Sequence, residues 1–318
     1  MNRCLYCYDE VPEGLDYHEK CSRAFFGFKA PPAIPYSLTD MSELAKQVVE
    51  RSVSVPGVQA KLSMGIVRRT LESAESRLTV VGALGGNYIL KPPSDRFPEL
   101  PENEHVTMRI AEAFSIAVVP TSLVRLKSGE FAFITRRVDR GKGDAKIHML
   151  DMLQIIEASE KYRSSMEKIG KALTAYSSNP LLDKLFLFER TVFCFLTCNN
   201  DMHLKNFSMI KAAAGWVLSP AYDLLNVALA LPTDNEELAL TLEGKRRKFK
   251  RNHFESFGKG LGLTDRQIRT VFTRFEQLKP KAIDWIQRSF LSPQSKSGYI
   301  QLLEDRYQSL QETSSDDD

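Results

Sequence analysis

Hydrophobic and polar positions divide the chain into a strand-rich part and a helical part. From Ser52 to about Asp139, short segments rich in β-branched and aromatic residues alternate with turn residues: KLSMGIV, RLTVVGA, NYILK, SLVRLKSG and FAFITRR. This alternation is typical of strands joined by tight turns, and KSG predicts a hairpin between the last two. One helix interrupts the strands, because apolar residues recur at helical spacing in PENEHVTMRIAEAFSI, which begins at Pro101.

From about Leu150 onward the pattern is helical. The segments with helical spacing are DMLQIIEASE, SSMEKIGKALTAY, NPLLDKLFLFERTVFCFLTC and DRQIRTVFTRFEQLKPKAIDWIQRSF, whereas WVLSPAYD predicts a strand that ends at Asp223. We therefore expect an α+β fold with two lobes, which would leave a ligand-binding cleft between them. The expected parts are a Cys/His segment (1–28), a Pro-rich linker (29–37), a β-rich lobe (38–140), a helical lobe (141–312) and a disordered tail (313–318).

Composition excludes several classes of protein. The 318 residues are 43% hydrophobic and 26% charged, as in ordinary folded domains. No apolar run reaches the roughly 18 residues that span a bilayer, and the start lacks the apolar centre of a signal peptide. We expect a cytoplasmic protein with no membrane contact. The net charge of +3 is too small to argue for direct nucleic-acid binding.

The five cysteines form an odd number, which argues against a disulfide framework. Cys194 and Cys198 fall in an apolar helical segment and are expected to be small core residues. The N-terminal segment differs, because CLYC is followed after ten residues by HEKC. This CxxC…HxxC spacing predicts a Zn²⁺ site, with a reduced metal-free knuckle as the alternative. The predicted ligands are Cys4, Cys7, His18 and Cys21.

The segment NNDMHLKNFS, which follows the most apolar helix, carries the candidate chemistry. Asp201 and Asn206 have the spacing of a kinase catalytic loop, in which the aspartate accepts a hydroxyl proton and the asparagine binds Mg²⁺. His203 and Lys205 lie in the same loop and are predicted to belong to the catalytic site with Asp201. Asp223 is predicted to complete the magnesium site, since Mg²⁺ prefers oxygen ligands; a helix N-cap is the alternative role.

Two further kinase elements precede this loop in the order that kinases have. Lys91 ends an apolar strand, and Glu104 on the following helix is predicted to hold its ammonium, as in the lysine–glutamate pair that positions ATP phosphates.

Before that strand, SVSVPGVQAKLSM contains a single glycine, so it is neither the glycine-rich kinase loop nor a Walker loop. Backbone N–H groups of Gly57, Val58 and Gln59 are nevertheless candidates to bind phosphate, with help from Lys61.

Together, SVSVPGVQAKLS, YILKPP, ELPENEH, NNDMHLKNFS and SPAYDLLN resemble the HipA-type toxin serine/threonine kinases, and most closely the short HipT form of three-component toxin–antitoxin systems. The similarity covers roughly residues 49–310. It implies a two-lobed protein-kinase-like fold, ATP and Mg²⁺, and the roles given above. It also implies autophosphorylation of Ser54 or Ser52, which would eject the phosphate loop and silence the enzyme.

The same resemblance implies the partners. The expected substrate is an aminoacyl-tRNA synthetase, whose phosphorylation stops translation; the expected partners are a helix-turn-helix antitoxin and a small HipS-like protein.

The chain also departs from the long-form family in two places. The first is the Cys/His segment. The second is Arg136 and Arg137, which stand near a position where the longer proteins carry an acidic residue, so the family's adenine-binding residues cannot be assigned to positions of this chain. Two alternatives are a small-molecule phosphotransferase of similar fold and a catalytically silent binding component.

Overall fold

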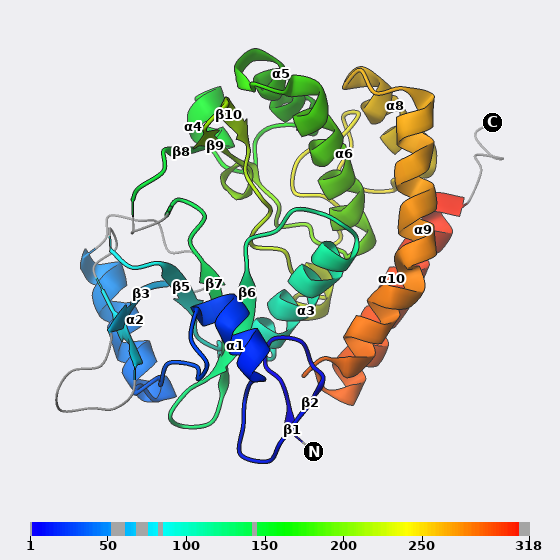
Figure 1. Cartoon of the computed structure of the whole chain (residues 1–318). Helices are drawn as coiled ribbons and strands as arrows, with labels where there is room; N and C mark the ends of the chain where they lie inside the picture. Colours follow the sequence, from blue (N-terminus) through cyan, green and yellow to red (C-terminus); the bar gives the residue numbers. More distant parts are fainter. Residues whose placement is uncertain (1, 52–60, 68–75, 82–84, 142–144, 312–318) are drawn as a thin grey trace. The chain divides into compact units, whose positions relative to one another are not determined.

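The computed structural model describes residues 2–51, 61–67, 76–81, 85–141 and 145–311, which form two compact units (Figure 1). Unit 1 comprises Met1–His105, Val119–Ala145 and Arg288–Phe290, and unit 2 comprises Val106–Val118, Lys146–Gln287 and Leu291–Asp318. Helix α3 (Leu100–Ala113) begins in unit 1 and ends in unit 2. No helix in the described part of the chain is long and apolar enough to cross a bilayer.

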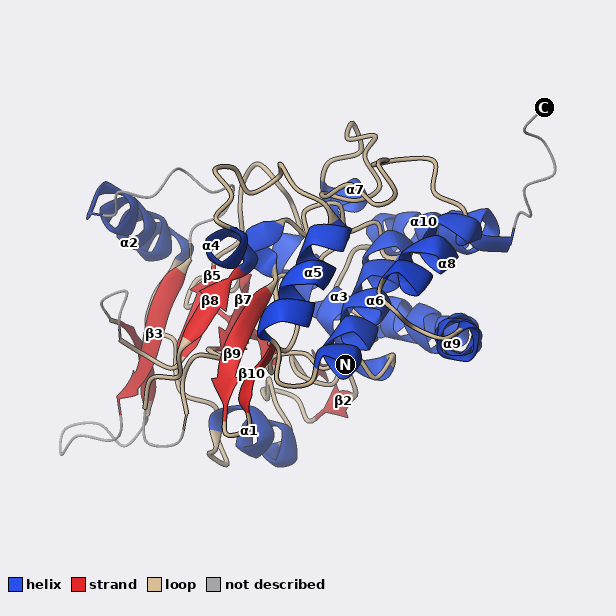
Figure 2. Ribbon diagram, turned by 90° about the horizontal axis from the view of Figure 1, so that it is seen from above, coloured by secondary structure: helices blue, strands red, loops and turns tan. Residues whose placement is uncertain are grey.

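Unit 1 is built on a five-stranded antiparallel sheet with the order β4-β3-β5-β7-β6, whose strands appear in red in Figure 2. The strands are β3 (Leu62–Val67), β4 (Arg77–Val80), β5 (Tyr88–Lys91), β6 (Thr121–Arg125) and β7 (Phe131–Arg136). The hairpin predicted at KSG is confirmed, because β6 pairs with β7 across a turn closed by the Leu126 N–H bond to Glu130 O. β5 lies in the middle of the sheet, so Lys91 ends a strand with neighbours on both sides.

The N-terminal segment belongs to the same unit as this sheet. It contains β1 (Asn2–Arg3), β2 (Glu10–Val11), α1 (Glu19–Phe26) and α2 (Leu38–Arg51). The segment predicted as a Pro-rich linker (29–37) is hydrogen-bonded to the residues of β4 and the residue before it. Ala33 exchanges two backbone hydrogen bonds of 2.9 Å with Ser76 and Leu78, beside β4, and the Tyr36 hydroxyl lies 3.1 Å from Thr79 Oγ1.

Unit 2 is mainly helical, as expected, but it also holds a three-stranded antiparallel sheet in the order β10-β9-β8. These strands are β8 (Met149–Asp151), β9 (Ser208–Ala212) and β10 (Gly215–Leu218). β8 and β9 were not predicted. The described helices that follow α3 are α4 (Met152–Ile156), α5 (Met166–Tyr176), α6 (Pro180–Leu196), a single 3₁₀ turn (Leu204–Asn206), α7 (Val227–Ala230), α8 (Arg251–Gly260), α9 (Asp265–Arg288) and α10 (Pro293–Gln311).

Helix α6 is the apolar core of unit 2. Phe188, Phe193 and Phe195 are fully buried, because apolar residues surround almost the whole circumference of the helix. The helix starts at Pro180, where the missing N–H costs no hydrogen bond, and ends at Leu196, two residues earlier than predicted. α9 and α10 run alongside each other in Figure 1, and the Tyr307 hydroxyl donates to Phe275 O at 2.8 Å.

Candidate functional site

The loop that follows α6 is a tight, bonded turn. Asn206 Nδ2 donates to Asp201 O at 2.9 Å, and the His203 N–H donates to the same oxygen at 2.8 Å. The Asn206 N–H in turn donates to His203 O at 2.9 Å. Because the amide nitrogen of Asn206 is held by a carbonyl, Oδ1 is the atom of that side chain available to a metal ion. The turn therefore keeps a carboxylate and an amide oxygen within one short segment.

The carboxylate of Asp201 has a partner that the sequence did not reveal. The Tyr162 hydroxyl donates to Asp201 Oδ1 at 2.5 Å, and the Tyr162 ring packs edge-on against His203 with centroids 5.0 Å apart. Burial and this bond to a carboxylate raise the pKa of Tyr162. Tyr162 lies in an irregular loop between α4 and α5, where no periodic signal marks a functional residue.

His203 lies in the field of both predicted acidic residues. Burial lowers its pKa, while the carboxylates of Asp201 and Asp223 act in the opposite direction. The effect of burial on the pKa of His203 thus outweighs that of the two carboxylates. Lys205, in contrast, is exposed, and its carbonyl accepts from the Tyr222 hydroxyl at 3.0 Å.

Two buried residues of α6 position the segment that carries Asp223. Asp183 accepts from the Leu218 N–H at 2.8 Å, and Arg190 donates to Ser219 O at 2.7 Å. Both side chains are almost fully buried, so these charge-assisted bonds fix the segment after β10 firmly.

The strand predicted over WVLSPAYD is present only as far as Leu218, and its predicted end at Asp223 is wrong. β10 ends at Leu218, because Pro220 has no N–H to continue a ladder. Asp223 lies in the following loop with a φ of 56°. The alternative role as a helix cap is also wrong, since Asn226 caps α7 by accepting from the Leu229 N–H.

In unit 1, Lys91 and Glu104 form a buried ion pair. Lys91 Nζ lies 2.5 Å from Glu104 Oε1, and the two side chains are only 5% and 1% exposed. The ammonium also lies over the Phe133 ring at 5.3 Å from its centroid, which is a favourable cation–π distance. The contact predicted between this strand lysine and this helix glutamate is therefore present; the binding of phosphate remains a prediction.

The rest of the predicted phosphate loop is only partly described. Gly57, Val58, Gln59, Ser52 and Ser54 lie outside the described residues. Lys61 is described and is exposed, directly before β3.

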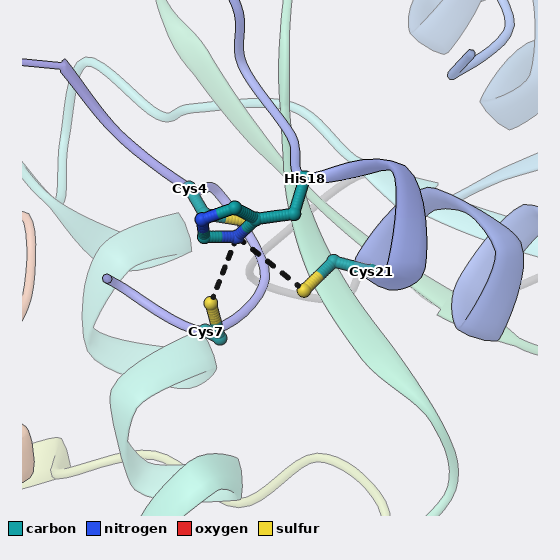
Figure 3. A group of neighbouring side chains, drawn as sticks. All are labelled: Cys4, Cys7, His18 and Cys21. Carbon is teal, nitrogen blue, oxygen red and sulfur yellow. Dashed lines mark hydrogen bonds between the residues drawn. The ribbon is translucent and has the colours of Figure 1, made fainter. Parts of the chain in front are cut away.

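The four side chains predicted as zinc ligands do meet, and we call them the Cys/His cluster: Cys4, Cys7, His18 and Cys21 (Figure 3). Their ligand atoms all lie within 4.8 Å of one another. Cys194 and Cys198 are both buried in unit 2, as expected for small core residues, although Cys198 lies beyond the end of α6.

The sequence is similar to a known protein family and to proteins that are named as kinases. Residues 53–283 match the family described as the HipA-like C-terminal domain. A putative kinase of Haemophilus influenzae is 29% identical over 290 residues, which cover 82% of each protein. The serine/threonine-protein kinase toxin HipA of Shewanella oneidensis is 26% identical over 73% of this chain. This chain covers 56% of that toxin, and 54% of the putative kinase Y4mE of Sinorhizobium fredii, with which it is 31% identical.

Solved structures show the same fold. HipA of S. oneidensis, in a complex with HipB and operator DNA, matches 87% of this chain and 71% of that chain with a TM-score of 0.68 and 23% identity. The Helicobacter pylori proinflammatory kinase CtkA matches 73% of this chain and 90% of that chain with a TM-score of 0.52 and 16% identity. The α+β fold is therefore protein-kinase-like, as predicted. The chain belongs to the family of the HipA-like C-terminal domain.

Proposed function

We propose that this protein is an ATP- and Mg²⁺-dependent serine/threonine protein kinase that acts as the toxin of a toxin–antitoxin system. The observation that carries the proposal is the turn from Asp201 to Asn206, in which the amide of Asn206 is fixed on the backbone of Asp201. Kinase catalysis needs a carboxylate and a metal-binding amide in that order and at that spacing. Relatives that are named as kinases support the same reaction.

The residues of unit 2 would act on the attacking hydroxyl and the metal. Asp201 accepts the hydroxyl proton while the hydroxyl oxygen bonds to the γ-phosphorus and the bond from that phosphorus to the β–γ bridging oxygen breaks, so that ADP leaves. Asn206 and Asp223 would hold Mg²⁺, which neutralises charge on the phosphates when it is bound. Tyr162 limits the rotation of Asp201 by holding one of its two oxygens.

The residues of unit 1 would bind the phosphates. Glu104 holds the ammonium of Lys91 in one position, so that the cation is oriented before ATP arrives. Gly57 and the two residues after it would add backbone N–H groups, and Lys61 a second cation.

The test is transfer of labelled phosphate from ATP by the purified protein. Asp201→Asn should abolish transfer and leave ATP binding in place, because the base is lost while the phosphate-binding residues remain. Asp265→Asn is a matched control, since Asp265 is an exposed acidic residue at the start of α9. Turnover at the wild-type rate by Asp201→Asn would contradict the assignment of the base.

We further propose regulation by autophosphorylation, as in HipA-type kinases. A phosphate on Ser54 or Ser52 carries close to two negative charges and would compete for the cations that bind ATP phosphates. The double variant Ser52→Ala/Ser54→Ala should therefore be more toxic than the wild type when it is expressed in cells. Equal growth of the two strains would contradict this switch.

The proposed substrate is an aminoacyl-tRNA synthetase, and the proposed partners are a helix-turn-helix antitoxin and, for a HipT-type toxin, a small HipS-like protein. The S. oneidensis HipA complex with HipB supports an antitoxin partner. Incubation of the protein with labelled ATP and a cell lysate, followed by identification of the labelled band, tests the substrate. Asp201→Asn serves as the blank, and labelling of no synthetase would reject the assignment.

A further inference from the structure

We propose that the Cys/His cluster binds one zinc ion, and that the bound ion fixes the N-terminal segment against β5, β6 and the first turns of α3. All of these elements belong to unit 1. The expected effect on the Lys91–Glu104 pair rests on the proposed function, whereas zinc binding itself does not.

The spacing of the ligand atoms is that of a tetrahedral zinc site. His18 Nδ1 lies 3.5 Å from Cys7 Sγ and 3.7 Å from Cys21 Sγ. Zinc–sulfur bonds of about 2.3 Å and zinc–nitrogen bonds of about 2.0 to 2.1 Å at tetrahedral angles place such atoms about 3.6 Å apart. Figure 3 shows the imidazole and the cysteine sulfurs facing a common centre.

The imidazole of His18 is held in the form that binds a metal. Its Nε2 lies 2.8 Å from Glu10 O. A carbonyl oxygen can only accept, so Nε2 carries the hydrogen and Nδ1 presents its lone pair to the sulfurs. A second hydrogen bond of this kind accompanies almost every metal-binding histidine, because it fixes the tautomer and the ring. His18 is also the N-cap residue of α1, yet its side chain makes no capping bond.

The backbone around the first ligand pair is strained. The Tyr8 N–H donates to Cys4 O at 2.9 Å and closes a turn over Cys7, and Tyr8 has a φ of 66°. A left-handed conformation is unfavourable for a residue other than glycine. A bound zinc ion would offset this cost, because it holds the two halves of the turn together.

The segment that carries the cluster is bonded to the edge strand β6. The Leu123 N–H donates to Leu5 O at 3.1 Å, and the buried Tyr17 hydroxyl lies 3.0 Å from Ser122 Oγ. The bonded residues of the segment, Leu5 and Tyr17, each directly adjoin a cluster ligand in the sequence. Movement of a ligand would therefore disturb β6 directly.

The same segment contacts the elements of the Lys91–Glu104 pair. Tyr8 directly follows Cys7 in the sequence, and its hydroxyl lies 2.7 Å from Nδ1 of His105. His105 in turn directly follows Glu104 in α3. On the other side, the Phe25 ring of α1 packs on Tyr88 of β5, with centroids 5.7 Å apart. The segment thus supports the helix that holds Glu104 and the strand that ends at Lys91.

The first test is the metal content of the purified full-length chain. Elemental analysis should find about one zinc per chain. Cys7→Ser should lose the zinc on dialysis against a chelator, whereas Cys198→Ser, which removes a buried cysteine of unit 2, should retain it. A wild-type protein without zinc, or a Cys7→Ser variant that retains it under the same dialysis, would overturn the proposal.

A second measurement covers the case in which Cys7→Ser does not fold. Wild-type protein titrated with a mercurial thiol reagent should release its zinc as the cluster cysteines react, and Co²⁺ added to the stripped protein should give the visible absorption of a tetrahedral thiolate site. Absence of both signals would equally overturn zinc binding.

The supporting role of the metal has its own readout. Backbone amides of β5, β6 and the first turns of α3 should exchange hydrogen faster in zinc-stripped protein than in loaded protein, while α5 of unit 2 should not change. Tyr8→Phe keeps all four ligands and removes the hydroxyl contact to His105, so it should keep zinc and loosen α3 alone. Unchanged exchange after stripping would overturn the supporting role, and no step of these tests depends on kinase activity.

Discussion

Glu102, in the first turn of α3, makes the stability of the protein depend on pH in an unusual direction. Its pKa is raised from 4.5 to about 7, chiefly because burial penalises the carboxylate and secondarily because of the charge of Glu99. The pKa is therefore higher in the folded chain than in the unfolded chain. The contribution of protonated Glu102 to the free energy of unfolding is therefore fully present below about pH 4.5, and it is lost as the pH rises through 7.

The substitution Glu102→Gln removes this dependence. Glutamine has nearly the shape of the protonated side chain and never ionises. The two pKa values, 4.5 and about 7, differ by an amount that corresponds to about 3 kcal/mol, since each unit is worth about 1.4 kcal/mol. We expect the variant to match the wild type in acid and to exceed its free energy of unfolding by up to about 3 kcal/mol in mild alkali.

Urea denaturation at about pH 5 and at about pH 8, followed by far-ultraviolet circular dichroism, measures the difference. Tryptophan fluorescence is unsuitable, because Trp216 and Trp285 both lie in unit 2, whereas Glu102 lies in unit 1. Glu112→Gln is the matched control: Glu112 is half exposed near the other end of α3, and its variant should follow the wild type. A Glu102→Gln variant whose advantage is the same at both pH values would refute the reasoning.

Three further substitutions test the contacts described above. Lys91→Met leaves the carboxylate of Glu104 buried without its ammonium and should lower the free energy of unfolding by about 3 to 5 kcal/mol. The double variant Lys91→Met/Glu104→Gln leaves no buried charge, so it should cost less than either single change in the same urea assay. Tyr162→Phe should lower the phosphotransfer kcat about tenfold with an unchanged circular dichroism spectrum, since Asp201 loses one orienting bond worth about 1.4 kcal/mol. Gly86→Ala should destabilise by more than about 2 kcal/mol in thermal unfolding, because its Cβ would lie 2.3 Å from a main-chain oxygen of β3 at a φ of 73°.

The local parts of the fold could be predicted from the sequence, and the parts that depend on distant partners could not. The strands of unit 1 and helices α3, α6 and α9 follow from the spacing of their apolar residues. β8 and β9 were missed because β8 has three residues and the pattern of β9 does not alternate: its first two residues are buried and its last two exposed. What stabilises these strands is their pairing, which joins residues about 60 positions apart.

In the candidate site, too, the local features could be predicted and the contacts between distant residues could not. The Asp201–Asn206 turn could be predicted because its chemistry lies within six residues. Tyr162 could not, since its hydroxyl reaches Asp201 from a loop 39 positions earlier. The expected strand to Asp223 is not present, because Pro220 follows the end of β10, and the role of Asp223 at the metal stays a prediction.

The Lys91–Glu104 pair is better explained by function than by stability. The two charged side chains are only 5% and 1% exposed, so they lose most of their hydration in the folded protein, and their mutual attraction compensates for that loss only in part. Apolar side chains of the same volume would stabilise the sheet and α3 at least as well, so the fold alone gives no reason for an ammonium at the end of a central strand. Binding of a phosphate would give that reason, because an ammonium already desolvated and held in place by Glu104 attracts an anion strongly. The double variant Lys91→Met/Glu104→Gln separates the two explanations: if the pair serves ATP, that protein should remain folded and lose nucleotide binding, and if it retains nucleotide binding, the pair has another purpose.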